Sequence, residues 1–268
     1  MRLAWATDTH LDASDWHYGL VEQVVGESAD ALVLCGDISE GPFLQHRLQL
    51  LSGALAPRPI WFVLGNHDYY GSTFWKTRRR VARLCRNTPG LEWLSSSGVV
   101  PLTGQTALIG DDGWYDLRLG SYEPEQLKDR LDDFFWNFDL KALDGEPLAD
   151  RLRLLADRSC ARLQRRLRQA LQYGYRTIVV ATHVPPFKEA CWYKGAPCAE
   201  DLLPFFGCGA MGEMLVREME IHPQATLTVL CGHTHAGPCD LLIRPNLRVL
   251  VGTADYGWPK VAGVLELQ

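Results

Sequence analysis

The stretch Gly65-Asn66-His67-Asp68 brings together three side chains that can do chemistry, directly after an apolar run that predicts a buried strand at 59–64. A glycine there lets the chain turn sharply as the strand ends. The amide oxygen of Asn66 can bind a metal ion, and the imidazole of His67 can exchange a proton near neutral pH. The carboxylate of Asp68 can orient that imidazole through a hydrogen bond. Polar residues after a strand usually serve the turn itself, so this stretch alone indicates little.

Four further polar clusters stand at the ends of other predicted strands. They are Asp8 with His10, Asp37, His183, and His233 with His235. Apolar runs predict the strands before them at 3–7, 31–35, 177–181 and 226–231. Ligands of α/β folds bind at the carboxyl ends of the strands, and neighbouring strands present those ends on one edge. We therefore expect the five clusters to meet.

Helical patterns separate these strands and must hold them in place. Apolar residues at helical spacing predict helices at 15–28, 42–55, 72–86, 148–173 and 212–220. Shorter strands are predicted at 99–102 and 106–109, and three antiparallel strands at 240–243, 248–251 and 261–267. The alternation of strands and helices indicates an α/β fold.

The segments 111–147 and 184–211 break this pattern. The first is rich in turn residues and aromatic side chains, and the second carries two prolines near its start that stop both a helix and a strand. We interpret both as insertions that cover the active-site edge of a single domain spanning residues 1–268. Most aromatic side chains of 111–147 then pack the insertion against the main body of the domain, while one or two can line a substrate pocket.

Composition narrows the class of protein. The chain has 268 residues, a formal net charge of −5 and an apolar fraction of 47%, which is ample for a packed core. The acidic balance argues against general nucleic-acid binding, and the six basic residues of the helix at 72–86 are interpreted as a solvated face. No apolar run approaches the roughly 20 residues that span a bilayer, and because the sequence enters a strand-like segment at once we expect no signal peptide. The eight cysteines follow no disulfide spacing, so we expect a reducing, cytoplasmic setting.

The polar clusters together have the composition of a transition-metal site. They hold five of the eight histidines, and their seven candidate ligands are Asp8, His10, Asp37, Asn66, His183, His233 and His235. Seven ligands are too many for one four-coordinate ion, so two divalent ions that share a carboxylate fit better. The mixture of imidazole and carboxylate favours Mn, Fe or Zn over Mg or Ca. Two such ions with two aspartates and a bridging hydroxide leave one net positive charge, which suits a phosphate anion.

The pattern resembles the calcineurin-like metallophosphoesterase family. That family carries Asp-x-His, Gly-Asp, Gly-Asn-His-Asp/Glu, a histidine, and Gly-His-x-His in this order. The chain has all five blocks, as Asp8-Thr9-His10, Gly36-Asp37, Gly65-Asn66-His67-Asp68, His183 and Gly232-His233-Thr234-His235. The resemblance implies the family's fold, a four-layer α-β-β-α sandwich of two mixed sheets flanked by helices.

The resemblance also implies a role for each site residue. One metal ion would be held by Asp8, His10, Asp37 and His235. Asp37 would bridge to a second ion, whose shell is completed by Asn66, His183 and His233. His67 matches the family's acid, which protonates the leaving-group oxygen, and Asp68 would hold its ring.

The function implied is metal-dependent hydrolysis of a phosphomonoester or phosphodiester of a small molecule, nucleotides included, by attack of a metal-bound hydroxide. Asp37 is followed by Ile38-Ser39-Glu40-Gly41, without the Asp-Arg-Gly of Ser/Thr protein phosphatases, which argues against that activity. Glu40 stands where purple acid phosphatases carry a tyrosine ligand, so no iron–tyrosinate colour is expected.

Two other classes of function stay open. One is a non-catalytic scaffold that uses the same fold as an interaction surface; such a protein could lose ligands freely, and this chain has lost none. The other is a nuclease, which calls for a basic groove that the net charge of −5 does not support.

Overall fold

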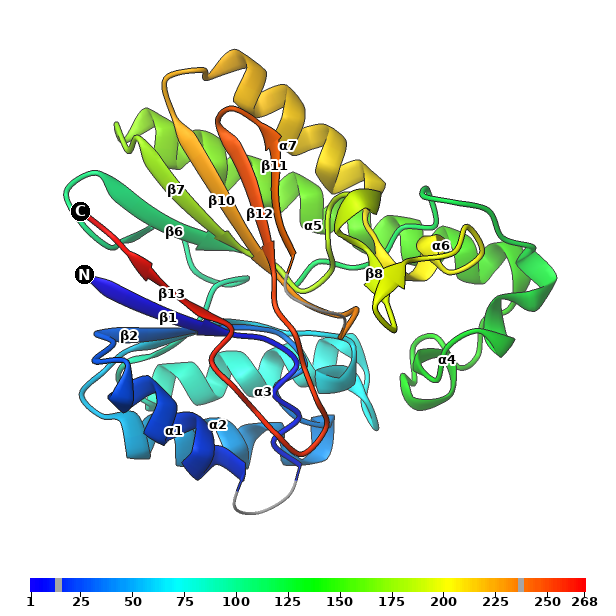
Figure 1. Ribbon diagram of the computed structural model, residues 1–268. Coiled ribbons are helices and arrows are strands. Elements are labelled where there is room, and N and C mark those ends of the chain that lie inside the picture. Colours follow the sequence, from blue (N-terminus) through cyan, green and yellow to red (C-terminus); the bar gives the residue numbers. More distant parts are fainter. Residues whose placement is uncertain (13–15, 236–238) are drawn as a thin grey trace.

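Two sheets lie face to face at the centre of the protein, and helices cover the outer face of each (Figure 1). The computed structural model describes residues 1–12, 16–235 and 239–268. The predicted four-layer sandwich of two mixed sheets flanked by helices is confirmed. Between the sheets, Leu3 and Trp5 of the first pack in one buried cluster with Val179 and Leu230 of the second.

The first sheet has five strands in the order β13-β1-β2-β3-β4. Their bounds are Gly263–Glu266 for β13, Arg2–Ala6 for β1, Ala31–Cys35 for β2, Ile60–Val63 for β3 and Leu91–Trp93 for β4. Strands β1 to β4 are parallel, and β13 pairs antiparallel with β1 at one edge. Because the four parallel strands point the same way, the loops after β1, β2 and β3 leave the sheet on one side.

The second sheet has six strands in the order β11-β12-β10-β7-β6-β5. Their bounds are Cys239–Arg244 for β11, Leu247–Val251 for β12, Thr226–Cys231 for β10, Thr177–Ala181 for β7, Thr106–Gly110 for β6 and Val100–Pro101 for β5. The four inner strands are parallel, and β11 and β5 are antiparallel edges. The strand at 248–251 pairs antiparallel with β11, as predicted, and on its other side it pairs parallel with β10, a pairing that the sequence pattern did not reveal.

Three helices cover the first sheet, namely α1 (Trp16–Gly26), α2 (Gly41–Leu55) and α3 (Phe74–Asn87), and the long helices α5 (Gly145–Gln172) and α7 (Gly209–Ile221) cover the second (Figure 1). The leucine stripe predicted for α2 is buried, from Leu44 to Leu55. Helix α5 ends at Gln172, just before Gly174, the glycine predicted to end it. The φ of 88° at Gly174 suits a glycine and lets the N–H of Tyr175 bond the Ala170 carbonyl at 3.2 Å. None of the described helices is both long and apolar enough to cross a bilayer.

The structure differs from the predicted elements at several boundaries. The first helix was predicted from Asp15, which lies outside the described residues, and its described part begins at Trp16. Helix α5 begins at Gly145 rather than at 148, because the Asp144 side chain accepts a hydrogen bond from the Gly145 N–H at 2.8 Å. Strand β4 was missed, since three residues at a sheet edge are too short to show a period.

The two segments expected to be insertions carry only short elements in the described structure. Segment 111–147 holds η2 (Pro124–Asp129) and α4 (Asp133–Trp136) before α5 begins. Segment 184–211 holds η3 (Lys188–Ala190), the hairpin of β8 (Trp192–Tyr193) and β9 (Ala196–Pro197), and α6 (Leu203–Phe206). A single turn, η1 (His67–Tyr69), follows β3.

Candidate metal centre

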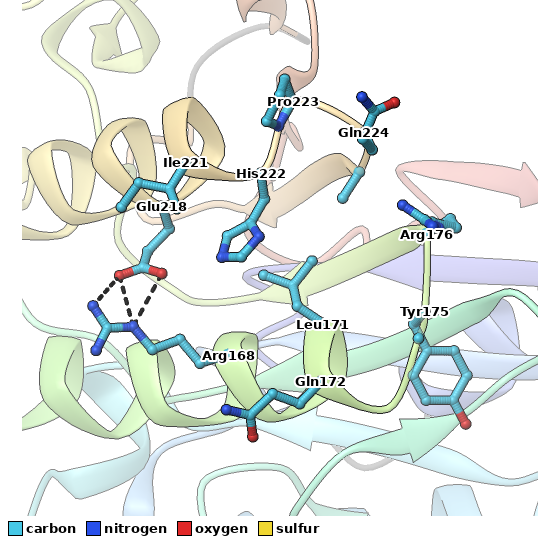
Figure 2. A pocket seen from close by; sticks show the side chains of 12 residues that line it. Arg168, Leu171, Gln172, Tyr175, Arg176, Glu218, Ile221, His222, Pro223 and Gln224 are labelled. Atoms are coloured by element: carbon cyan, nitrogen blue, oxygen red, sulfur yellow. Dashed lines mark hydrogen bonds and ion pairs between the residues drawn. The ribbon is translucent and has the colours of Figure 1, made fainter.

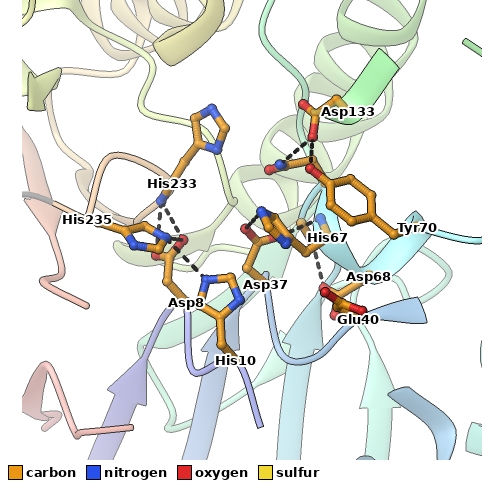
Figure 3. Close-up of polar contacts among 12 residues, drawn as sticks. Asp8, His10, Asp37, Glu40, His67, Asp68, Tyr70, Asp133, His233 and His235 are labelled. Atoms are coloured by element: carbon orange, nitrogen blue, oxygen red, sulfur yellow. Dashed lines mark hydrogen bonds and ion pairs between the residues drawn. The ribbon is translucent and has the colours of Figure 1, made fainter. Parts of the chain in front are cut away.

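All five predicted clusters meet where the parallel strands of the two sheets end (Figure 3). The ligand candidates that follow β1, β2 and β10 hold backbone angles that non-glycine residues rarely adopt. Their φ values are 50° for Asp8, 39° for His10, 47° for Asp37, 70° for His233 and 54° for His235. Left-handed conformations at such residues are strained and persist at functional sites, where the surrounding structure holds them.

The first group of ligand atoms comes from Asp8, His10, Asp37 and His235, which each offer one atom within 4.8 Å of the others. The Nε2 atoms of His10 and His235 face each other at 3.2 Å, and Nε2 of His235 lies 3.4 Å from Oδ1 of Asp8. The other ring nitrogen of His10, Nδ1, is buried and has no hydrogen-bond partner among the described residues. Ring nitrogens gathered against carboxylates in this way form a donor set for a divalent cation.

The second group comes from Asp37, His183 and His233, again within 4.8 Å of one another. Nε2 of His183 lies 3.4 Å from Oδ2 of Asp37 and 2.9 Å from Oδ1 of Asn66. Asn66 therefore turns its oxygen toward this group. Asp37 belongs to both groups, which is the position that a carboxylate shared by two ions requires.

Backbone carbonyls hold two of the histidine rings from behind. Nδ1 of His183 lies 2.9 Å from the Cys35 carbonyl, and Nε2 of His233 lies 2.9 Å from the Phe205 carbonyl. In a neutral ring, a nitrogen that donates to a carbonyl leaves the opposite nitrogen unprotonated, and the ring geometry turns that nitrogen away from the carbonyl. The rings are thus oriented to offer Nε2 of His183 and Nδ1 of His233 to the site.

The charges of the site are coupled across these contacts. Burial alone would raise the pKa of Asp8, but the hydrogen bond from His235 and the charge of His183 lower it to about 2. Burial also opposes ionisation of Asp37, yet the charges of His183 and His67 hold its pKa well below the usual range. Both aspartates are therefore anionic at neutral pH, as metal binding requires.

The histidines divide into two kinds. Burial lowers the pKa of His10 and of His233 to about 4, so both rings are neutral and ready to bind a metal ion. For His183 burial acts in the same direction, but the neighbouring charge of Asp37 outweighs it and raises the pKa to about 10. A metal ion that binds His183 would have to displace this proton.

His67 lies beside the two groups and belongs to neither. Its Nε2 is 3.9 Å from Oδ2 of Asp37, and its side chain is 22% exposed where that of Asp37 is 2% exposed. The ring packs on Tyr70 with centroids 4.3 Å apart and meets His10 edge-on at 4.9 Å. This position at the open side of the site suits contact with a substrate.

Asp68 does not hold the His67 ring, contrary to the prediction. Its Oδ1 accepts hydrogen bonds from the N–H groups of Ile38 and Ser39, both at 3.0 Å, and its Oδ2 accepts one from Gly65 at 2.8 Å. Because these three donors use both carboxylate oxygens, Asp68 joins the loop after β2 to the loop after β3. It fixes the two loops that carry Asp37 and Asn66.

Two residues near the site were missed by sequence reasoning. Oδ1 of Asp133, in α4, accepts a hydrogen bond from Nδ2 of Asn66 at 2.8 Å. The Tyr256 ring lies 4.4 Å from the His10 ring and 4.9 Å from the His235 ring, and it is 62% exposed. Neither belongs to a recognisable motif, and the one signal for Asp133 was an acidic residue within an aromatic segment.

A separate depression of about 500 Å³ lies between the end of α5 and α7 (Figure 2). It is lined by Tyr175 and Arg176, which precede β7, and by Gln224 and Ala225, which precede β10. It therefore lies at the amino ends of these strands, opposite the candidate metal centre. Its main polar contact is an ion pair between Arg168 and Glu218, and it contains none of the predicted site residues.

The chain matches one family model and resembles solved structures. A family model described as calcineurin-like phosphoesterase matches residues 1–237. The crystal structure of TT1561 of Thermus thermophilus has a similar fold, with a TM-score of 0.55 and 16% identity over 94% of this chain and 88% of that chain. The crystal structure of the calcineurin-like phosphoesterase YfkN from Bacillus subtilis matches with a TM-score of 0.46 and 12% identity over 98% of this chain and 88% of that chain. No curated protein matches the chain.

Proposed function

The chain belongs to the calcineurin-like phosphoesterase family, and we propose that it hydrolyses a phosphate ester of a small molecule with two divalent transition-metal ions bound at its strand ends. The observation that carries this proposal is the pair of ligand groups that share Asp37. A single buried carboxylate placed between two sets of imidazoles matches the bridge of a two-ion centre.

The residues present fit such a centre. We assign one ion to Asp8, His10, Asp37 and His235, and the other to Asp37, Asn66, His183 and His233. The ring nitrogens of His10 and His235 face each other at 3.2 Å beside the Asp8 carboxylate, and Nδ1 of His10 is buried without a hydrogen-bond partner among the described residues, which favours a cation near these rings. The mixture of imidazole and carboxylate favours Mn, Fe or Zn. When bound, such ions act as Lewis acids toward phosphoryl oxygens and supply an activated water molecule.

His67 supplies the proton that the leaving group needs. Its Nε2 lies 3.9 Å from Oδ2 of Asp37, and its side chain is 22% exposed, so the ring can meet the leaving oxygen of a bound ester. The backbone N–H of His67 donates to Oδ1 of Asp37 at 2.9 Å, so the acid and the shared carboxylate are held together. The Tyr70 ring packed on the imidazole restricts its rotation.

An exposed aromatic ring beside the site supports a small organic substrate. The Tyr256 ring is 62% exposed and lies 4.4 Å from the His10 ring and 4.9 Å from the His235 ring, so a flat organic group could pack against it while its phosphate meets the metal centre. Nucleotides have such a group.

Because the cysteines of the sequence follow no disulfide spacing, we place the reaction in a reducing, cytoplasmic setting as part of the proposal.

The experiment that tests the proposal combines metal analysis with a substrate screen. The purified protein should contain up to two transition-metal ions per chain, and chelation should abolish hydrolysis of an aryl phosphate ester. Removal of the ions should also lower the free energy of unfolding, since an ion at 100 times its dissociation constant stabilises the fold by about 2.7 kcal/mol. A panel of phosphomonoesters, phosphodiesters and cyclic nucleotides with added Mn²⁺ then identifies the substrate class. Full activity after exhaustive chelation would contradict the proposal.

A further inference from the structure

The segment 111–147 reaches the candidate metal centre through one buried carboxylate. Asp133 begins α4, and its Oδ1 accepts the hydrogen bond from Nδ2 of Asn66 at 2.8 Å. The two residues are 67 positions apart in the sequence. Figure 3 shows Asp133 above Tyr70, on the side of the site away from Asp8 and His235. A segment outside the family's motifs is thereby joined to a proposed metal ligand.

This contact decides which side of the Asn66 amide faces the metal centre. A carboxylate only accepts hydrogen bonds, whereas an amide carries an oxygen acceptor on one side and an NH₂ donor on the other. Asp133 must therefore be met by the NH₂ group, which turns the amide oxygen to the opposite side, 2.9 Å from Nε2 of His183. If the amide turned over, its oxygen would oppose the Asp133 carboxylate, and an NH₂ group that cannot bind a metal ion would face the site.

Two tyrosines hold Asp133 in turn. The Tyr70 hydroxyl donates to Oδ1 of Asp133, and the Tyr115 hydroxyl donates to Oδ2 at 2.8 Å. Burial, and after it the charge of Asp133, raises the pKa of both hydroxyls, so both remain protonated donors. All these side chains are buried, where an unpaired polar group costs free energy. The arrangement that pairs every group is therefore strongly favoured.

The same tyrosines pack against two histidines of the site. The Tyr115 ring stacks on the His233 ring, with centroids 5.9 Å apart and 15° between the planes. The Tyr70 ring packs on the His67 ring at 4.3 Å and 33°. Asp133 thus supports Asn66 directly, and it supports a second proposed ligand and the proposed acid through aromatic rings.

We propose that Asp133 is a positioning residue that holds the Asn66 amide oxygen toward the second metal ion, so that the segment 111–147 completes that ion's site. The inference rests on the proposed function, because it takes Asn66 as a ligand of the ion held with Asp37, His183 and His233. The competing explanation is that Asp133 merely anchors the segment to the rest of the protein. Asp139 is an example of such an anchor. Its Oδ2 accepts the Phe74 N–H at 2.7 Å, and within the described residues no hydrogen bond joins it to Asn66.

The test is calorimetric titration of metal-stripped protein with Mn²⁺. The wild type should bind two ions. Asp133→Ala should lower the affinity for one of these ions by about 10–100-fold, as is typical when the hydrogen-bond partner of a metal ligand is removed. Asp139→Ala removes an anchor of the same segment and should leave both affinities unchanged. Asp133→Asn keeps the size of the side chain but lets the Asn66 amide turn over, so it should also lower the affinity for the second ion.

An Asn66→Ala background separates positioning from general damage. Because Asp133 acts through Asn66, Asp133→Ala should cause no further loss of Mn²⁺ affinity there, whereas independent effects would add. An equal loss of Mn²⁺ affinity in Asp133→Ala and Asp139→Ala would overturn the inference. Unchanged affinity for both ions in a folded Asp133→Ala variant would overturn it as well. If Asp133→Ala does not fold, unchanged affinity in Asp133→Asn would overturn it instead. A wild type that binds no Mn²⁺ would contradict the proposed function itself, so the two failures can be told apart.

Discussion

Gly65 lies directly against Asp37. A Cβ atom at position 65 would stand 2.1 Å from Oδ1 of Asp37 and 2.7 Å from Nε2 of His183, both far inside van der Waals contact. No side chain fits there while the shared carboxylate keeps its position. The sequence pattern suggested a glycine for a sharp turn, but the structure gives it another purpose, which is close approach of the backbone to the metal centre.

Gly65→Ala should therefore displace Asp37 or His183 and reduce the number of bound metal ions. Misplacement of a site group by about 1 Å can cost roughly 10²-fold in rate, so turnover should fall by about that factor. Gly53→Ala is the matched control, since a Cβ atom at that position in α2 has nothing within 4 Å. Metal analysis and kinetics on both variants check this. Full metal content and normal turnover in Gly65→Ala would show that Asp37 does not need its present position.

Much of the site could be predicted because its signals are local. The strands that deliver site residues are mostly apolar runs followed closely by polar residues, and Ala31–Cys35 and Thr177–Ala181 were placed to the residue. Parallel strands then bring their ends together without any further information from the sequence. This rule groups the clusters after β1, β2 and β3 at one edge of the first sheet and those after β7 and β10 at one edge of the second.

What could not be predicted depends on contacts between distant segments. Asp133 meets Asn66 across 67 residues, and no period or spacing links them. For Asp68 the sequence offers a carboxylate beside an imidazole and beside backbone N–H groups, and it does not say which donor is nearer. Three N–H groups converge on that carboxylate only after the loops after β2 and β3 have been brought together.

Asp37→Asn should weaken both metal sites, because a neutral amide cannot replace the charge of a shared carboxylate. The fold should remain, since the change is nearly isosteric and the amide oxygen can still accept the hydrogen bond from the His67 N–H at 2.9 Å. Metal content by elemental analysis, together with a thermal unfolding curve, checks both parts. Retention of two ions and wild-type turnover would show that the assignment of Asp37 as the bridge is wrong.

Asp68→Asn should lower the free energy of unfolding by about 1–3 kcal/mol, because the NH₂ group of the new amide would oppose at least one of the three backbone donors. Asp150→Asn, at an exposed position on α5, is the control and should change stability by less than about 0.5 kcal/mol. Urea unfolding of metal-stripped protein measures this without a contribution from metal binding. A variant of unchanged stability whose kinetic defect copies that of His67→Ala would restore the original assignment of Asp68 to the His67 ring.

His67→Ala distinguishes three roles for this histidine. If it donates a proton to the leaving group, the variant should keep both metal ions and lose roughly 10²–10⁴-fold in rate on alkyl phosphate esters. The loss should be much smaller on p-nitrophenyl esters, because p-nitrophenolate leaves with little need of a proton. If His67 is instead a metal ligand, the variant should lose an ion and hydrolyse both esters more slowly to the same degree. If His67 only shapes the turn, neither rate should change much. Metal content and both rates, measured on one preparation, separate these cases. Equal losses on the two esters with both ions retained would count against proton donation by His67.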